Sequence, residues 1–205
     1  MSQGPAYALM TFCAGLIVLL GWFYAMVDNP RAGAMIKTSF LLFALPILFV
    51  PGDTIISKLG MLALVAWEEI LKAFASTREK EPLDRFRLVS LFGVWELVLD
   101  KPIWALLNSQ SITGWSTPGI LVLVYATALP VLMHTVTAAA YAFRFDRHLW
   151  AAFLFSFAVH SVFNATVDYF GVSLIAVAAE TLILLAVLAT VVKLLGFPLA
   201  SQRSR

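Results

Sequence analysis

Long apolar stretches recur along the chain and are separated by short segments rich in Gly, Pro, Asp, Asn and charged residues. A helix needs about 20 predominantly apolar residues to cross a bilayer, and most of the stretches come close to that length. The second stretch is shorter and contains Pro46 and Pro51, so six full spans plus a short or broken one is the alternative to seven. The pattern predicts an all-α, polytopic transmembrane helix bundle of about seven spans, at residues 6–27, 38–51, 59–76, 88–107, 118–142, 150–170 and 172–195.

The composition agrees with this fold class. Hydrophobic residues make up 61% of the 205 residues and charged residues only 13%, whereas ordinary soluble domains are about 45–50% apolar. The net charge of +2 comes with no clustered basic face, so no nucleic-acid partner is expected. Cys13 is the only cysteine and cannot form an internal disulfide. We therefore expect a single integral membrane domain over residues 1–205, surrounded by the lipid bilayer.

Lysine and arginine fall in alternate connecting segments, which predicts the orientation of the chain. Basic residues concentrate in the first, third and fifth connections and in the C-terminal tail, while the segments between them hold little beyond Lys58 and Lys101. Because cytoplasmic loops carry the excess of basic residues, we expect the N-terminus outside and the C-terminus in the cytoplasm. The basic residues are Arg31, Lys37, Arg78, Lys80, Arg85, Arg87, Arg144, Arg147, Arg203 and Arg205.

Ionisable residues interrupt four of the predicted spans at a similar depth. With a rise of 1.5 Å per residue, each lies roughly 12–15 Å from the predicted cytoplasmic end of its helix. Ionisable side chains inside a membrane are costly and are functional-site candidates by default. The five residues are Glu68, Glu69, Glu96, His134 and His160.

The spacing within the helices narrows their roles. Lys72 follows Glu68 by four residues and Glu69 by three, so it can pair with one glutamate and leave the other as a candidate general acid or base. Glu180 and Asp100 stay ambiguous, because either could pair with Lys101 or line a cavity. A polar stripe recurs every four residues along the sixth predicted helix and comprises Ser156, His160, Asn164 and Asp168.

Four segments resemble a known family in their order and spacing. They are EEILK at residues 68–72, FGVWELVL around Glu96, LPVLMHTVTAA around His134, and HSVFN at residues 160–164. Together they are similar to the PrsW-like branch of the CPBP (CAAX protease and bacteriocin-processing) intramembrane protease superfamily, over about residues 60–165. The chain departs from that pattern in having Lys72 one position before the arginine of the CAAX-protease branch, and Leu97 where an asparagine commonly follows the glutamate.

The resemblance implies an intramembrane endopeptidase with a catalytic core at about residues 59–170, in a bacterial or archaeal cytoplasmic membrane. Its substrate would be a membrane-associated peptide or a single-pass membrane protein, cut in or next to the membrane segment. Glu68 or Glu69 would activate a water, and His134 or His160 would bind that water or stabilise the oxyanion. Asn164 would orient a histidine or donate to the developing charge, with Lys72 and Glu96 as supporting residues.

The cofactor and the function class each have alternatives. The site works either without a cofactor or with zinc held by Glu69, His134 and His160. A proton- or ion-coupled transporter could use the buried Glu, Lys and His residues as a relay, although the chain shows no inverted repeat. A haem or quinone protein could use the two histidines as axial ligands, but the paired glutamates would then be unexplained.

Overall fold

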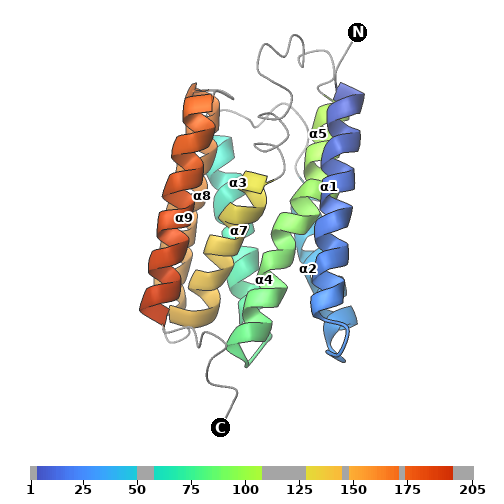
Figure 1. Ribbon diagram of the computed structural model, residues 1–205, viewed down its shortest axis with the longest axis vertical. Helices are drawn as coiled ribbons and strands as arrows, with labels where there is room; N and C mark the ends of the chain where they lie inside the picture. Colours follow the sequence, from blue (N-terminus) through green and yellow to red (C-terminus); the bar gives the residue numbers. More distant parts are fainter. Residues whose placement is uncertain (1–3, 50–57, 108–127, 145–147, 171–173, 196–205) are drawn as a thin grey trace.

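Helix α4 lies at the centre of the helical arrangement and packs against α1, α2, α3 and α7 (Figure 1). The computed structural model describes residues 4–49, 58–107, 128–144, 148–170 and 174–195. Every element within these residues is helical, which confirms the all-α fold class. The elements are α1 (Gly4–Ala25), α2 (Ala32–Phe49), α3 (Lys58–Ser76), α4 (Pro82–Trp95), η1 (Glu96–Asp100), α5 (Lys101–Leu107), α7 (Leu129–Ala139), η3 (Ala140–Arg144), α8 (Leu149–Phe170) and α9 (Leu174–Leu195).

Two helices begin six residues earlier than the apolar pattern predicts. α2 starts at Ala32 instead of residue 38, and α4 starts at Pro82 instead of residue 88. Proline at the first helical position needs no backbone hydrogen bond and has the φ angle of a helix, so Pro82 is a favourable start. Hydropathy detects only the apolar part of a helix, so it misses the first turns of α4, which contain Asp84, Arg85 and Arg87. α2 also continues past Pro46 to Phe49, while Pro51 and residues 118–127 lie outside the described residues.

A π-helical turn lies in the middle of the longest continuous helix. α4, η1 and α5 follow one another without a break from Pro82 to Leu107. Within η1, the backbone N–H of Lys101 donates to the carbonyl of Glu96, five residues earlier. A π turn inserts one extra residue into an α-helix, and such turns are frequent at functional sites.

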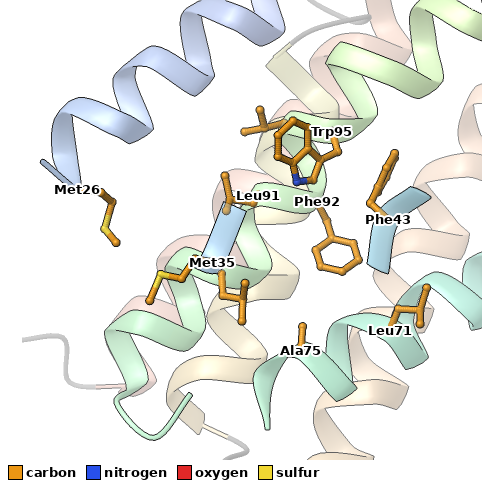
Figure 2. Close-up of a cluster of buried hydrophobic side chains, with 10 residues drawn as sticks. Met26, Met35, Phe43, Leu71, Ala75, Leu91, Phe92 and Trp95 are labelled. Atoms are coloured by element: carbon orange, nitrogen blue, oxygen red, sulfur yellow. The ribbon is translucent and has the colours of Figure 1, made fainter. Parts of the chain in front are cut away.

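Aromatic and aliphatic side chains of α2, α3 and α4 form a buried cluster (Figure 2). Phe92 and Trp95 of α4 each meet a phenylalanine of α2 in an edge-to-face contact. The indole Nε1 of Trp95 also donates to the hydroxyl of Ser39, 2.9 Å away. These contacts fix α4 against the first half of the bundle, and the cluster contains Met26, Met35, Phe43, Leu71, Ala75, Leu88, Leu91, Phe92, Val94 and Trp95.

The first and third connections meet at one end of the bundle. The guanidinium of Arg31 lies 2.6 Å from the carboxylate of Glu79, and the side-chain amide of Asn29 donates to Asp84 at 3.2 Å. In Figure 1 this is the lower end, where α9 also finishes, whereas α1 starts at the upper end. The described ends of the chain therefore lie at opposite ends of the helices.

Two helical stretches are long and apolar enough to cross a membrane, Pro5–Ala25 and Leu149–Thr166. Shorter apolar helices cover Ala32–Ala44, Leu129–Ala142 and Ala178–Thr190. Length and composition alone are weak support for a membrane location, since buried core helices can pass the same test. Only 17% and 22% of the residues in the two long stretches are buried, however, so most of their apolar surface faces outward.

Candidate active site

Glu69 of α3 is fully buried and is surrounded by hydrogen-bond donors. Its Oε1 atom accepts from the Nζ atom of Lys72 at 2.6 Å and lies 3.0 Å from the Nδ1 atom of His160. Its Oε2 atom lies 3.1 Å from the hydroxyl of Tyr141, which also lies 3.0 Å from the carbonyl of Glu69. Both carboxylate oxygens are thus engaged by side chains from α3, η3 and α8, which joins the three elements at one point.

Glu68 is the other carboxylate of the pair and is more accessible. Its Oε1 atom lies 3.0 Å from the Nζ atom of Lys72, and its side chain is 22% exposed while those of Glu69 and Lys72 are 0% exposed. We predicted that Lys72 would pair with one glutamate and leave the other free, and this division is wrong. Lys72 contacts both, because residues three and four positions earlier on a helix are both within reach of a long side chain. Both glutamates lie beside Lys72, and they differ in exposure and in the further hydrogen bonds that Glu69 makes to His160 and Tyr141.

His134 connects α7 to the π-helical turn after α4. Its Nε2 atom lies 2.6 Å from the Oε2 atom of Glu96, whose Oε1 atom lies 2.8 Å from the Nζ atom of Lys101. The rings of His134 and His160 meet edge to face with their centroids 5.6 Å apart. The helices can approach closely here because Gly93 faces His134, and a Cβ atom at Gly93 would lie 2.8 Å from the Cβ atom of the histidine.

The two histidines direct their remaining nitrogens toward Glu68. Carboxylates only accept hydrogen bonds, so Glu96 requires the proton of His134 on Nε2, and Glu69 requires the proton of His160 on Nδ1. In the neutral rings, Nδ1 of His134 and Nε2 of His160 are then acceptors, and they lie 3.6 and 4.0 Å from the carboxylate oxygens of Glu68. Four acceptor atoms from three residues therefore face one another, and a group that supplies donors or positive charge would satisfy them.

Such a group could be a water molecule or a metal ion. Ligand atoms of Glu68, Glu69 and His160 lie within 4.8 Å of one another. Histidine ligands of metals characteristically donate their second ring N–H to a carboxylate, as both histidines do here. Glu69, which we expected among the zinc ligands with the two histidines, has its oxygens occupied by Lys72, His160 and Tyr141. The open carboxylate beside the histidines is Glu68.

Asn164 and the rest of the α8 stripe make fewer contacts than expected. Asn164 lies one turn beyond His160 and is half-buried, and the described side chains show no hydrogen bond between it and the glutamate pair. The side chain of Ser156, one turn before His160, is buried and interacts with the hydroxyl of Tyr141. The side chain of Asp168 lies outside the described residues. The catalytic role assigned to Asn164 therefore stays a prediction.

Comparison with known proteins adds no assignment. No family model, curated protein or solved structure matches the chain. The chemistry of the site therefore has to come from its own geometry.

Three residues that shape the site were given no role in it from the sequence. The pattern places Tyr141 on the helical face of His134, seven residues earlier, but does not show that it contacts Glu69. Lys101 lies five residues after Glu96, a spacing that brings side chains together only around a π turn. Gly93 carries no polar group, and its importance depends on how closely α4 and α7 approach. Lys101 pairs with Glu96, and Glu180 lies on α9 without an ion pair to any described residue.

Proposed function

We propose that the chain is an integral membrane protein with about seven spans, its N-terminus outside and its C-terminus in the cytoplasm. Large apolar side chains project outward from α1, α8 and α9, where a bilayer would cover them. Those of Ile17, Leu20, Trp150, Leu154 and Leu182 are between 61% and 77% exposed. The basic residues Arg31, Arg78 and Arg87 belong to the end of the bundle that would face the cytoplasm. A reporter fused after residue 205 should be cytoplasmic and one inserted at Gly114 should be external; finding both on one side would exclude this topology.

We propose that the protein is an intramembrane endopeptidase that hydrolyses a peptide bond in or next to the membrane segment of its substrate. One observation carries this function: the partly exposed carboxylate of Glu68 faces, on each histidine, the ring nitrogen that is not bonded to Glu96 or Glu69. A water molecule there can donate to Glu68 and to a histidine together. That places a general base beside the oxygen that would attack a carbonyl carbon.

The glutamates and the two histidines have different roles in the proposed hydrolysis. Glu68 takes a proton from the water while the oxygen of the water bonds to the carbonyl carbon of the substrate. Glu68 then passes that proton to the amine that leaves. His134 or His160 accepts the second hydrogen bond of the water and holds it in position for the attack. Glu69 holds His160 in orientation, and Glu96 does the same for His134, as a buried carboxylate orients a catalytic histidine in other hydrolases.

Zinc fits the same acceptors but competes with a cation that is already present. Glu68 and His160 would hold it together with Glu69, since ligand atoms of these three residues lie within 4.8 Å of one another. Zinc supplies a Lewis acid that activates water and polarises the substrate carbonyl. The ammonium of Lys72 lies 3.0 Å from Glu68 and would repel a divalent ion, so we favour the metal-free form.

The decisive experiment compares membrane-protein fragments in cells that produce the wild type or the Glu68→Gln variant. Glutamine has the size of glutamate but cannot accept the proton, so the fragments that depend on the protein should disappear. Glu81→Gln, at an exposed residue that precedes α4, is the matched control and should leave the fragments unchanged. Fragments that persist in a stably produced Glu68→Gln protein would exclude Glu68 as the base.

An ion-coupled transporter is the second candidate, and one observation favours it. Ionisable groups follow one another from Lys101 through Glu96, His134 and Glu68 to Lys72, with consecutive atoms 2.6–3.6 Å apart. Such a series of ionisable groups suits a proton relay as well as a hydrolase. Proteoliposomes with a pH-sensitive dye distinguish the two, because a relay would carry protons in the absence of any peptide and Glu68→Gln would stop it.

A further inference from the structure

A cleft between α8 and α9 lies apart from the candidate active site. Its volume is about 300 Å³, within the range of small-molecule sites. The α8 side chains that line it are on a different face of the helix from the stripe with Ser156 and His160. Most of the lining is aliphatic or aromatic and includes Phe155, Val159, Phe163, Ile183, Leu184 and Val187.

One carboxyl group interrupts this apolar lining. Glu180 is only 5% exposed, and neither of its carboxylate oxygens has a hydrogen-bond partner among the described residues. An unpaired polar group buried in an apolar environment carries a desolvation cost, and a bilayer offers no water to reduce that cost. A ligand with hydrogen-bond donors would remove it.

Thr166 is the other polar residue of the cleft and is also available only as an acceptor. Its hydroxyl donates to the carbonyl of Val162 at 2.8 Å, which leaves lone pairs on the oxygen but no hydrogen to give. Three residues, 171–173, connect α8 to α9, so the end of one helix lies near the start of the other. Thr166 and Glu180 therefore both lie toward this end of the cleft, and each can accept a hydrogen bond from a ligand.

We propose that the cleft binds a single-chain amphiphile whose head group is a primary amine. The ammonium supplies several N–H donors and a positive charge for Glu180, with Thr166 as a second acceptor. The alkyl chain lies along the apolar walls toward Phe155 and Val187. From Phe155 to Thr166 the helix rises by about 16 Å, a length that suits a medium alkyl chain. The site is independent of peptide hydrolysis, so its failure would leave the proposed protease untouched.

Thermal unfolding of the purified protein in a maltoside detergent tests the site with three probes of equal chain length. Dodecylamine has the donors and the charge, dodecyltrimethylammonium has the charge without N–H donors, and dodecanol has one donor without charge. A ligand that binds only the folded protein raises its unfolding midpoint. We expect dodecylamine to raise the midpoint by about 2–4 °C and the other two to raise it less.

Two variants test whether the rise in the unfolding midpoint comes from binding in this cleft. Glu180→Gln keeps the size of the side chain and should reduce the dodecylamine shift to that of dodecanol. Ala158→Phe fills the cleft without changing Glu180 and should abolish all three shifts. Equal shifts from the amine and the alcohol in the wild type would overturn the proposal, as would an undiminished dodecylamine shift in either variant.

Discussion

The Nε2 atom of His134 in α7 lies 2.6 Å from the Oε2 atom of Glu96, the first residue of η1. A carboxylate at this distance fixes both the ring orientation and the nitrogen that carries the proton. Lys101 in turn holds the second oxygen of Glu96 at 2.8 Å. The partly buried ion pair of Glu96 and Lys101 therefore positions His134 on the side of the ring away from Glu68.

Glu96→Gln should impair catalysis through His134. The amide has one acceptor oxygen where the carboxylate has two, and it carries no charge, so it cannot hold His134 and Lys101 as Glu96 does and the ring loses its fixed orientation. We expect cleavage to fall about 10- to 100-fold, the range found when a carboxylate behind a functional histidine is removed. Glu96→Asp, which retains the carboxylate, should recover part of the activity. Equal activity of Glu96→Gln and the wild type in the fragment assay would rule out this positioning role.

Lys72→Met should lower stability more than any other single change in the cluster. It leaves Glu68 and Glu69 buried side by side without the cation that lies 3.0 and 2.6 Å from them. Removing one partner of a buried ion pair typically costs about 3–5 kcal/mol. Thermal unfolding in detergent measures the loss. Adding Glu69→Gln to Lys72→Met should restore part of the midpoint, and a double variant less stable than Lys72→Met would contradict this explanation.

Gly93→Ala should force α4 and α7 apart. The new Cβ atom would lie 2.8 Å from the Cβ atom of His134, closer than carbon atoms pack, and neither group can move without its helix. We expect a loss of about 1–3 kcal/mol together with reduced cleavage. Gly21→Ala in α1 is the matched control, since no atom lies within 4 Å of its added Cβ. Similar unfolding midpoints for the two variants would show that the contact at Gly93 is not limiting.

Glu79, in the connection between α3 and α4, should make stability depend on pH. Burial raises the pKa of its carboxyl group above the ordinary 4.5, Arg31 partly opposes this, and Asp84 adds to it. The folded protein therefore binds this proton more tightly than the unfolded chain does. The stabilising contribution is present below pH 4.5 and is lost as the pH rises through the raised pKa. Unfolding midpoints of Glu79→Gln should lack this component, and an identical pH profile for both proteins would refute it.

Cleavage should survive the removal of divalent metals. Lys72 already supplies positive charge at Glu68, so the water can be activated without a metal ion. Protein treated with EDTA and passed into metal-free buffer should cleave as the untreated protein does. Elemental analysis that finds one zinc per chain, lost together with activity in His160→Ala, would instead establish the zinc-dependent mechanism.

The sequence predicted both the helices and the convergence of the polar residues at one site, but from two different patterns. Long apolar runs predict helices because each helix of the bundle has a continuous apolar surface, packed against its neighbours or facing outward. Glu68, Glu69, Glu96, His134 and His160 were expected together because each lies at a similar distance from a helix end. α4 in fact starts six residues earlier, so Glu96 lies deeper along its helix than predicted, and its contact with His134 still forms.

Other features of the site depend on contacts between different helices, which spacing along the sequence does not show. Which glutamate stays accessible depends on Tyr141 and His160, which come from η3 and α8 and cover Glu69 but not Glu68. Whether Glu180 pairs with Lys101 or lines a cavity depends on the rotation of α9 against α8. Spacing along one helix cannot determine either.

The π turn at Glu96–Asp100 also changes how this helix should be compared with others. One additional residue shifts everything after it by about 100° around the axis. A helical wheel drawn continuously from Pro82 would therefore place Lys101 on the wrong side of Glu96. An alignment with an ordinary α-helix needs a one-residue gap within residues 97–100. Deleting one of these residues should therefore convert the π turn into an ordinary α turn, in which the lysine follows the glutamate by four positions and stays beside it, and the face of α5 that packs on α1 should keep its orientation.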